Sequence, residues 1–140
     1  MTPTGLTKDA GWQIGVSRTV PVPLDDVWAG LTSDDGVGEW LGDLGAGLPA
    51  TKGEAYRTAG GAQGELRSLR PGDRVRLTYQ PPGRSSPTIL QVAVTPGRSA
   101  GGPSTVVRFH QDHLADAAER EAMRDHWAGV LDRLAARLGW

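Results

Sequence analysis

Residues 116–138, DAAEREAMRDHWAGVLDRLAARL, decide the fold, because they are the longest segment whose apolar side chains recur with the 3.6-residue period of a helix. Gly139 follows directly, as expected of a helix C-cap. At 1.5 Å per residue the helix is about 33 Å long, enough to cross a whole sheet. Its apolar side chains fall within a stripe about 100° wide, formed by Met123, Trp127, Val130, Leu131, Leu134 and Leu138.

The segments before this helix alternate between apolar and polar residues, which is typical of strands. Short turns and loops separate most of them, so we expect an antiparallel meander. Pro23 opens a short helix over residues 24–31, and Ser33 or Asp34 can cap a second one that runs to about Trp40. The expected strands are residues 12–20, 54–58, 63–69 and 74–80, one between the loops 81–87 and 97–103, and a last one from 105 to 111.

Composition excludes several functional classes. The chain has 140 residues, a net charge of −1 and no cysteine, so we expect no nucleic-acid binding, no disulfide and no thiolate metal site. No segment reaches the ~20 apolar residues of a membrane span, and the first residues contain no apolar signal-peptide core. We therefore expect a cytoplasmic protein without membrane insertion. Residues 1–11 are predicted to be a disordered N-terminal segment, and residues 12–140 a single domain.

A narrow helical stripe laid against a curved sheet predicts a hollow. A strongly twisted sheet of about six strands must cover its apolar face, and only the last helix is long enough to do so. Such a stripe touches the sheet along one line and leaves space beside it. The order of strand, two short helices, strands and long helix predicts an α+β helix-grip fold with a cavity between the sheet and the C-terminal helix.

The chain resembles the START-like SRPBCC superfamily, and within it the branch named for the C-terminal domain of the activator of Hsp90 ATPase. The resemblance covers residues 12–138, with one departure at His126, where glycine usually precedes the tryptophan. It implies the helix-grip fold and a cavity for lipids, polyketides or other apolar molecules. It does not carry over the Hsp90 association, because the eukaryotic activators use an additional domain. The resemblance depends on residues 23–28 (PLDDVW), Trp40, residues 64–66 (GEL), residues 70–79 (RPGDRVRLTY), Trp127, Leu131 and Leu134.

Large aromatic and inward-facing polar side chains are the candidate ligand-binding residues. Five tryptophans in a small domain must be buried or line something. A closed core in which these side chains only pack together is the alternative. Arg120 lies on the same helical stripe and either reaches solvent or contacts a polar head group. The expected cavity wall consists of Trp40, Tyr79, Phe109, Gln111, Met123 and Trp127.

The sequence predicts neither a metal site nor a catalytic group, and no cofactor. His110 and His113 lie three residues apart at the end of a strand and so point to opposite faces, with His110 outward. No G-x-S-x-G elbow or nucleophilic cysteine is present.

The sequence thus favours a binding domain, either monomer or homodimer, for an apolar or amphipathic small molecule. Two alternatives stay open: a polyketide cyclase or aromatase-like enzyme, and a ligand-free protein-interaction module, chaperone-associated or stress-related.

Overall fold

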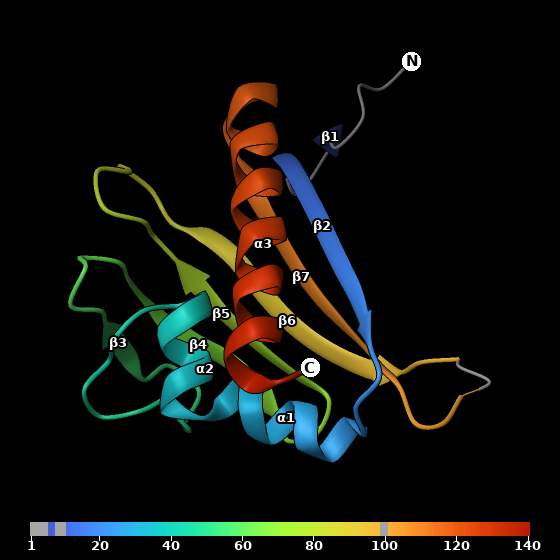
Figure 1. Ribbon diagram of the computed structural model, residues 1–140. Helices are drawn as coiled ribbons and strands as arrows, with labels where there is room; N and C mark the ends of the chain where they lie inside the picture. Colours follow the sequence, from blue (N-terminus) through green and yellow to red (C-terminus); the bar gives the residue numbers. More distant parts are fainter. Residues whose placement is uncertain (1–5, 8–10, 99–100) are drawn as a thin grey trace.

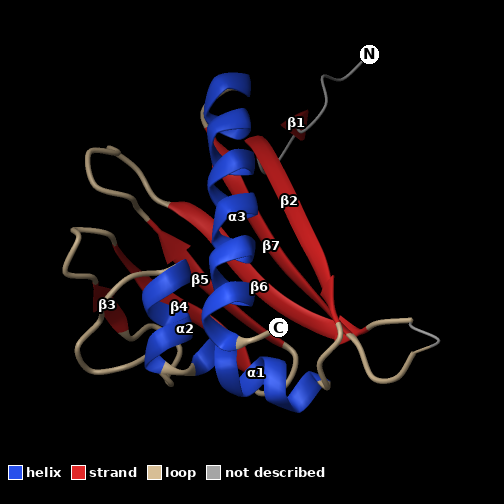
Figure 2. Ribbon diagram, in the orientation of Figure 1, coloured by secondary structure: helices blue, strands red, loops and turns tan. Residues whose placement is uncertain are grey.

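A long helix lies across one face of a curved antiparallel sheet in the computed structural model, which describes residues 6–7, 11–98 and 101–140 (Figure 1). The seven strands lie in the order β1-β2-β7-β6-β5-β4-β3, and every neighbouring pair is antiparallel. Figure 2 shows the two short helices at one end of the long one. The strands are β1 Leu6–Thr7, β2 Gly11–Val20, β3 Ala55–Arg57, β4 Gln63–Arg70, β5 Arg74–Tyr79, β6 Thr88–Pro96 and β7 Thr105–Leu114.

Each helix begins and ends where its residues allow. Helix α1 is Leu24–Thr32, α2 is Asp34–Trp40 and α3 is Ala117–Leu138. The Ser33 hydroxyl accepts the Gly36 N–H at 3.1 Å and caps α2. The Asp116 carboxylate accepts the Glu119 N–H at 2.8 Å and caps α3 in the same way. Gly139 ends α3 in the left-handed conformation, with φ of 73°, which glycine adopts without steric cost.

The core lies between the inner face of the sheet and α3. The alternation predicted for the strands holds, because the side chains that face α3 are buried and their neighbours are not. Across the sheet, Val16 pairs with Phe109, Phe109 with Val92 and Val92 with Val75. On the helix, Trp127, Val130, Leu131 and Leu134 of the predicted stripe are buried, and Met123 and Leu138 are partly buried. The helix-grip fold predicted from the sequence is confirmed.

The structure differs from the prediction at the first edge of the sheet. The sequence predicted about six strands, and the seventh is β1, in which Leu6 pairs with Trp12 and Thr7 with Gly11. These two residues belong to the segment 1–11 that was predicted to be disordered. Residues 1–5 and 8–10 of that segment lie outside the described residues.

Candidate functional site

The predicted wall residues meet beneath α3 as a cluster of packed rings. Trp127 is fully buried and stacks on Phe109, with ring centroids 4.9 Å apart and planes at 9°. Trp40 lies 6.2 Å from Phe109, and Tyr79 lies 6.1 Å from Trp127, both tilted. The Trp40 Nε1–H donates to the Leu31 carbonyl at 2.8 Å, which fixes the end of α2 against α1. The structure therefore brings these four rings together.

A chain of hydrogen bonds runs through the same cluster from the helix across three strands. The Trp127 Nε1–H donates to Gln111 Oε1 at 2.9 Å, and Gln111 Nε2–H donates to Thr88 Oγ1 at 2.9 Å. The Thr88 hydroxyl donates in turn to the Tyr79 carbonyl at 2.6 Å. Gln111 and Thr88 are both buried, so these bonds supply the partners that their polar atoms need. Gln111, predicted to need a partner, thus finds two within the protein.

The hydroxyl of Tyr79 is the unpaired polar group of the cluster. Tyr79 is 8% exposed, and its hydroxyl, which reaches the solvent, has no hydrogen-bonding partner among the residues that the structure describes. Burial raises the pKa of Tyr79 above its ordinary value of 10.0. The hydroxyl therefore stays protonated at neutral pH and is able to donate one hydrogen bond and accept others.

Helix α3 packs closely on the sheet over only half of its length. Its buried side chains, from Trp127 to Ala135, all lie from the middle of the helix onward. In the N-terminal half, Glu119, Arg120 and Met123 are half-buried and the remaining residues are exposed. Because Glu119, Met123 and Trp127 follow one another at four-residue intervals, they lie on one side of the helix. This side leads from the loosely packed end of the domain to the ring cluster.

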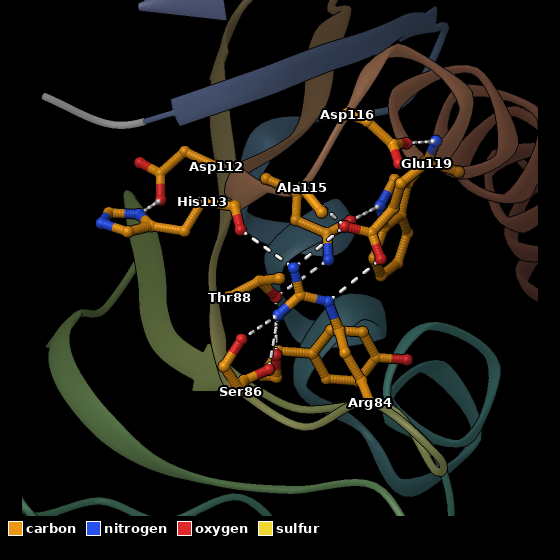
Figure 3. Close-up of polar contacts among 11 residues, drawn as sticks. Arg84, Ser86, Thr88, Asp112, His113, Ala115, Asp116 and Glu119 are labelled. Atoms are coloured by element: carbon orange, nitrogen blue, oxygen red, sulfur yellow. Dashed lines mark hydrogen bonds and ion pairs between the residues drawn. The ribbon is translucent and has the colours of Figure 1, made fainter. Parts of the chain in front are cut away.

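Arg84, in the loop between β5 and β6, connects that loop to the start of α3 (Figure 3). Its guanidinium donates to both carboxylate oxygens of Glu119, at 2.9 and 3.0 Å, and to the His113 carbonyl at 3.0 Å. Glu119 Oε1 also accepts the Ala115 N–H at 2.8 Å. The hydrogen bond from Arg84 holds the pKa of Glu119 below its usual range. The pair is a bidentate, charge-assisted contact across the loosely packed end.

The predicted head-group arginine, Arg120, points to β2. Its Nε–H donates to the Gln13 carbonyl at 2.9 Å, and its Nη1 contacts Glu121 at 2.9 Å. These contacts tie the first turns of α3 to the neighbouring strand.

His110 and His113 lie apart from the ring cluster, whereas His126 packs edge-on against Trp127, with ring centroids 4.6 Å apart. His110 is on the outer face of the sheet, as predicted, and its Nε2 bonds to Gln13 Oε1 at 2.8 Å. His113 has a φ of 63° where β7 bulges, and its Nδ1 lies 2.6 Å from Asp112. Within the described residues no group of three acidic or histidine side chains is placed to hold a metal ion, and none of the helices is long and apolar enough to cross a membrane.

Sequence reasoning missed Arg84 and Thr88. The inward alternation of β6, in which Leu90, Val92 and Val94 are buried, extends back by one step to Thr88 and could have found it. Arg84 lies in an irregular loop, which has no regular period. Its spacing in the sequence therefore could not predict that its partner is Glu119.

Together these features define a helix-grip domain whose core contains a buried polar chain and whose long helix is loosely packed at its N-terminal end. Residues 21–139 match the family model described as "Activator of Hsp90 ATPase homolog 1-like protein", and the chain belongs to this family. A search of the curated proteins finds no match.

Several solved structures share the fold. DynU16, a protein in the dynemicin biosynthetic locus, aligns with a TM-score of 0.69 and 24% identity over 91% of this chain, which spans 47% of that protein. PFC0360w, an HSP90 activator from Plasmodium falciparum, aligns with a TM-score of 0.69 and 12% identity over 92% of this chain and 97% of its own. The Aha1 dimer from Colwellia psychrerythraea aligns with a TM-score of 0.63 and 19% identity, over 90% of this chain and 95% of its own. At these identities the likeness concerns the fold.

Proposed function

We propose that the chain is a non-catalytic binding domain for an apolar or amphipathic small molecule, which enters beneath the N-terminal half of α3. The observation that carries the proposal is the uneven packing of this helix, whose buried side chains begin only at Trp127. A tightly closed domain would bury side chains along the whole of its covering helix.

The chemistry of this end suits an amphipathic ligand. Met123 is flexible and polarizable, so it adapts to ligands of different shape. Tyr79 offers an unpaired hydroxyl beside the Trp127 ring, and a polar group of the ligand would satisfy it. Arg84 and Glu119 lie across the same end, where their ion pair would have to yield, or be bypassed, as the ligand enters. Trp40, Phe109 and Gln111 would then form the inner wall, and Arg120 would hold the helix to β2.

Three titratable groups of this region, Tyr56, Tyr79 and Glu119, favour binding over turnover. Burial raises the pKa values of Tyr56 and Tyr79, which removes both from the range of a general base at neutral pH. Arg84 keeps Glu119 ionised, so this carboxylate is a poor proton donor. These three groups weigh against a cyclase-like enzyme. The group that such an enzyme would use is His126, which packs on Trp127 and whose pKa is lowered by burial and by Arg133, so that its ring is neutral and able to accept a proton.

A ligand-free protein-interaction module is the second candidate, and the packing of the ring cluster favours it. Trp127 is fully buried, stacked on Phe109 and hydrogen-bonded to Gln111, so the centre of the domain is occupied by its own side chains. In that case the loosely packed end would be a surface feature without a small-molecule role.

Binding of the fluorescent dye 1-anilinonaphthalene-8-sulfonate to matched variants tests the proposal. Met123→Trp places a larger side chain on the half-buried side of α3, one turn before Trp127. Ala122→Trp places the same indole on the exposed side of the same helix. We expect the first variant to weaken saturable dye binding about tenfold, equivalent to about 1.4 kcal/mol, and the second to leave it unchanged. Urea unfolding of both variants checks that the fold is retained.

Two outcomes would count against the small-molecule function. The wild-type protein could bind no dye saturably and carry no co-purified mass in native mass spectrometry, as a ligand-free interaction module would. Alternatively, both tryptophan variants could bind the dye as the wild type does, which would place the dye away from α3.

A further inference from the structure

The outer face of the sheet, away from α3, carries a block of basic side chains on adjacent strands. On β5, Arg74 and Arg76 point outward, because Val75 and Leu77 between and beyond them are buried. Arg74 pairs with Ala93 of β6, and Ala93 pairs with Arg108 of β7. In the next row, Arg76 pairs with Gln91, and Gln91 with His110. The basic side chains therefore flank a centre made of the uncharged Ala93 and Gln91.

A pocket of about 360 Å³ opens in this block. Neighbouring strands lie about 4.8 Å apart, so side chains on β5 and β7 face each other across β6 at about 10 Å. That distance leaves room for one small group between them. The lining side chains are Arg76, Ile89, Gln91, Arg108, His110 and Asp112.

The lining of this pocket carries more positive than negative charge, with Arg76 and Arg108 against the carboxylate of Asp112. Arg76 and Arg108 make no ion pair or hydrogen bond through their guanidinium groups within the part of the chain that the structure describes. Asp112 is the acidic residue of the lining, and it is already bonded to His113.

His110 completes the pocket as a titratable group. Its Nε2 donates to Gln13 Oε1 of β2, while Asp112 and Arg108 of β7 and Arg76 of β5 act on it electrostatically. Burial, opposed by Asp112 and assisted by the two arginines, holds the pKa of His110 below its usual value. An anion between the arginines would offset their effect on the ring.

We propose that this outer-face pocket binds a phosphate or carboxylate group of a small molecule, with Arg76 and Arg108 as the charged ligands and Gln91 as a neutral donor. Guanidinium groups bind such oxyanions through paired N–H donors. The guanidinium of Arg108 lies over Gly15 of β2 and would turn from there toward the centre of the pocket. The site lies on the opposite face of the sheet from α3 and is independent of the proposed apolar site.

Histidine-ring NMR of the full chain tests this site with inorganic phosphate and acetate as probes. Saturable phosphate binding should move the His110 resonances and raise the pH at which this ring titrates. Arg76→Gln and Arg108→Gln should each weaken the phosphate effect about tenfold, the loss expected for one charge-assisted contact. Arg124→Gln removes the same charge from the exposed side of α3 and should change nothing.

Binding of glycerol 3-phosphate distinguishes a phosphate group carried by a larger molecule from a free phosphate ion. Tighter binding than inorganic phosphate indicates a group that belongs to a larger molecule, and equal binding indicates a free ion. The proposal is overturned if sodium chloride at the same ionic strength reproduces the shift, or if the two arginine variants keep the wild-type response. Since both arginines are exposed, urea unfolding should confirm that these variants fold.

Discussion

Gln111 shows how one buried carboxamide determines the position of a helix. It is 1% exposed, and it accepts from Trp127 on α3 while it donates to Thr88 on β6. The sequence predicted that Gln111 faces inward, since it follows Phe109 in the alternation of β7. It could not predict the partners, because these come from distant elements whose relative placement no local pattern encodes.

Gln111→Leu should lower the free energy of unfolding by about 1–3 kcal/mol, because it leaves the Trp127 indole N–H buried without an acceptor. Urea denaturation followed by circular dichroism measures the change. The matched control is the double variant Gln111→Leu with Trp127→Phe, which also removes the N–H donor. If the lost hydrogen bond causes the effect, the double variant loses less than the sum of the single changes. Strict additivity would contradict this explanation.

The two glycines of α2 have opposite structural roles, although both weaken a helix intrinsically. A Cβ built on Gly36 would lie 1.9 Å from the Gly30 carbonyl oxygen, so glycine is required where α2 meets α1. A Cβ on Gly38 would meet nothing within 4 Å. Helix propensity alone treats the two positions alike, and only the contact between the helices separates them.

Alanine substitutions at these positions should therefore change stability in opposite directions. Gly38→Ala should raise the free energy of unfolding by about 0.5–1 kcal/mol through helix propensity. Gly36→Ala should lower it by about 1–3 kcal/mol, because the added methyl group forces α1 and α2 apart. Thermal unfolding of the two variants side by side provides the comparison. A stabilising Gly36→Ala would show that α2 does not pack on α1 as described.

The contact between Arg84 and Glu119 should make the start of α3 sensitive to acid. The pKa of Glu119 is lowered in the folded state, so its contribution to stability is present above the ordinary value of 4.5 and is lost as the pH falls through the folded value. Glu119→Gln keeps an acceptor for the Ala115 N–H but removes the charge. It should reduce stability by about 1 kcal/mol at neutral pH and flatten the loss below about pH 4.5. Urea unfolding midpoints of the wild type and Glu119→Gln, measured from neutral pH to below about pH 4.5, would test this prediction. Parallel curves of midpoint against pH for the two proteins would contradict it.

At the scale of the whole molecule, the sequence predicted the architecture better than the interior. The helix stripe, the strand alternation and the caps are local patterns, and each appears where it was expected. The filling of the space beneath α3 depends on how rings from α2, β5, β7 and α3 fit together. Helical period and strand alternation predict which side chains point inward but not how their shapes fit together. They could therefore not distinguish the wall of a cavity from a packed core.

Trp127→Ala measures how completely this interior is filled. With the indole buried and stacked on Phe109, the variant should lose about 3–5 kcal/mol of unfolding free energy. Trp140→Ala is a suitable comparison, because Trp140 is only partly buried at the end of the chain and should lose less. Equal losses would mean that Trp127 already borders empty space.

The pairing of β2 with β7 has a consequence for how the protein is made. Ile14 lies opposite Gln111, so β2 finds its partner only after β3 to β6 and then β7 have been synthesised. Until then the apolar side of β2 has no neighbour, and closing so large a loop slows folding. Completion of the sheet should therefore wait for β7, and nascent chains stalled before Thr105 should remain sensitive to protease.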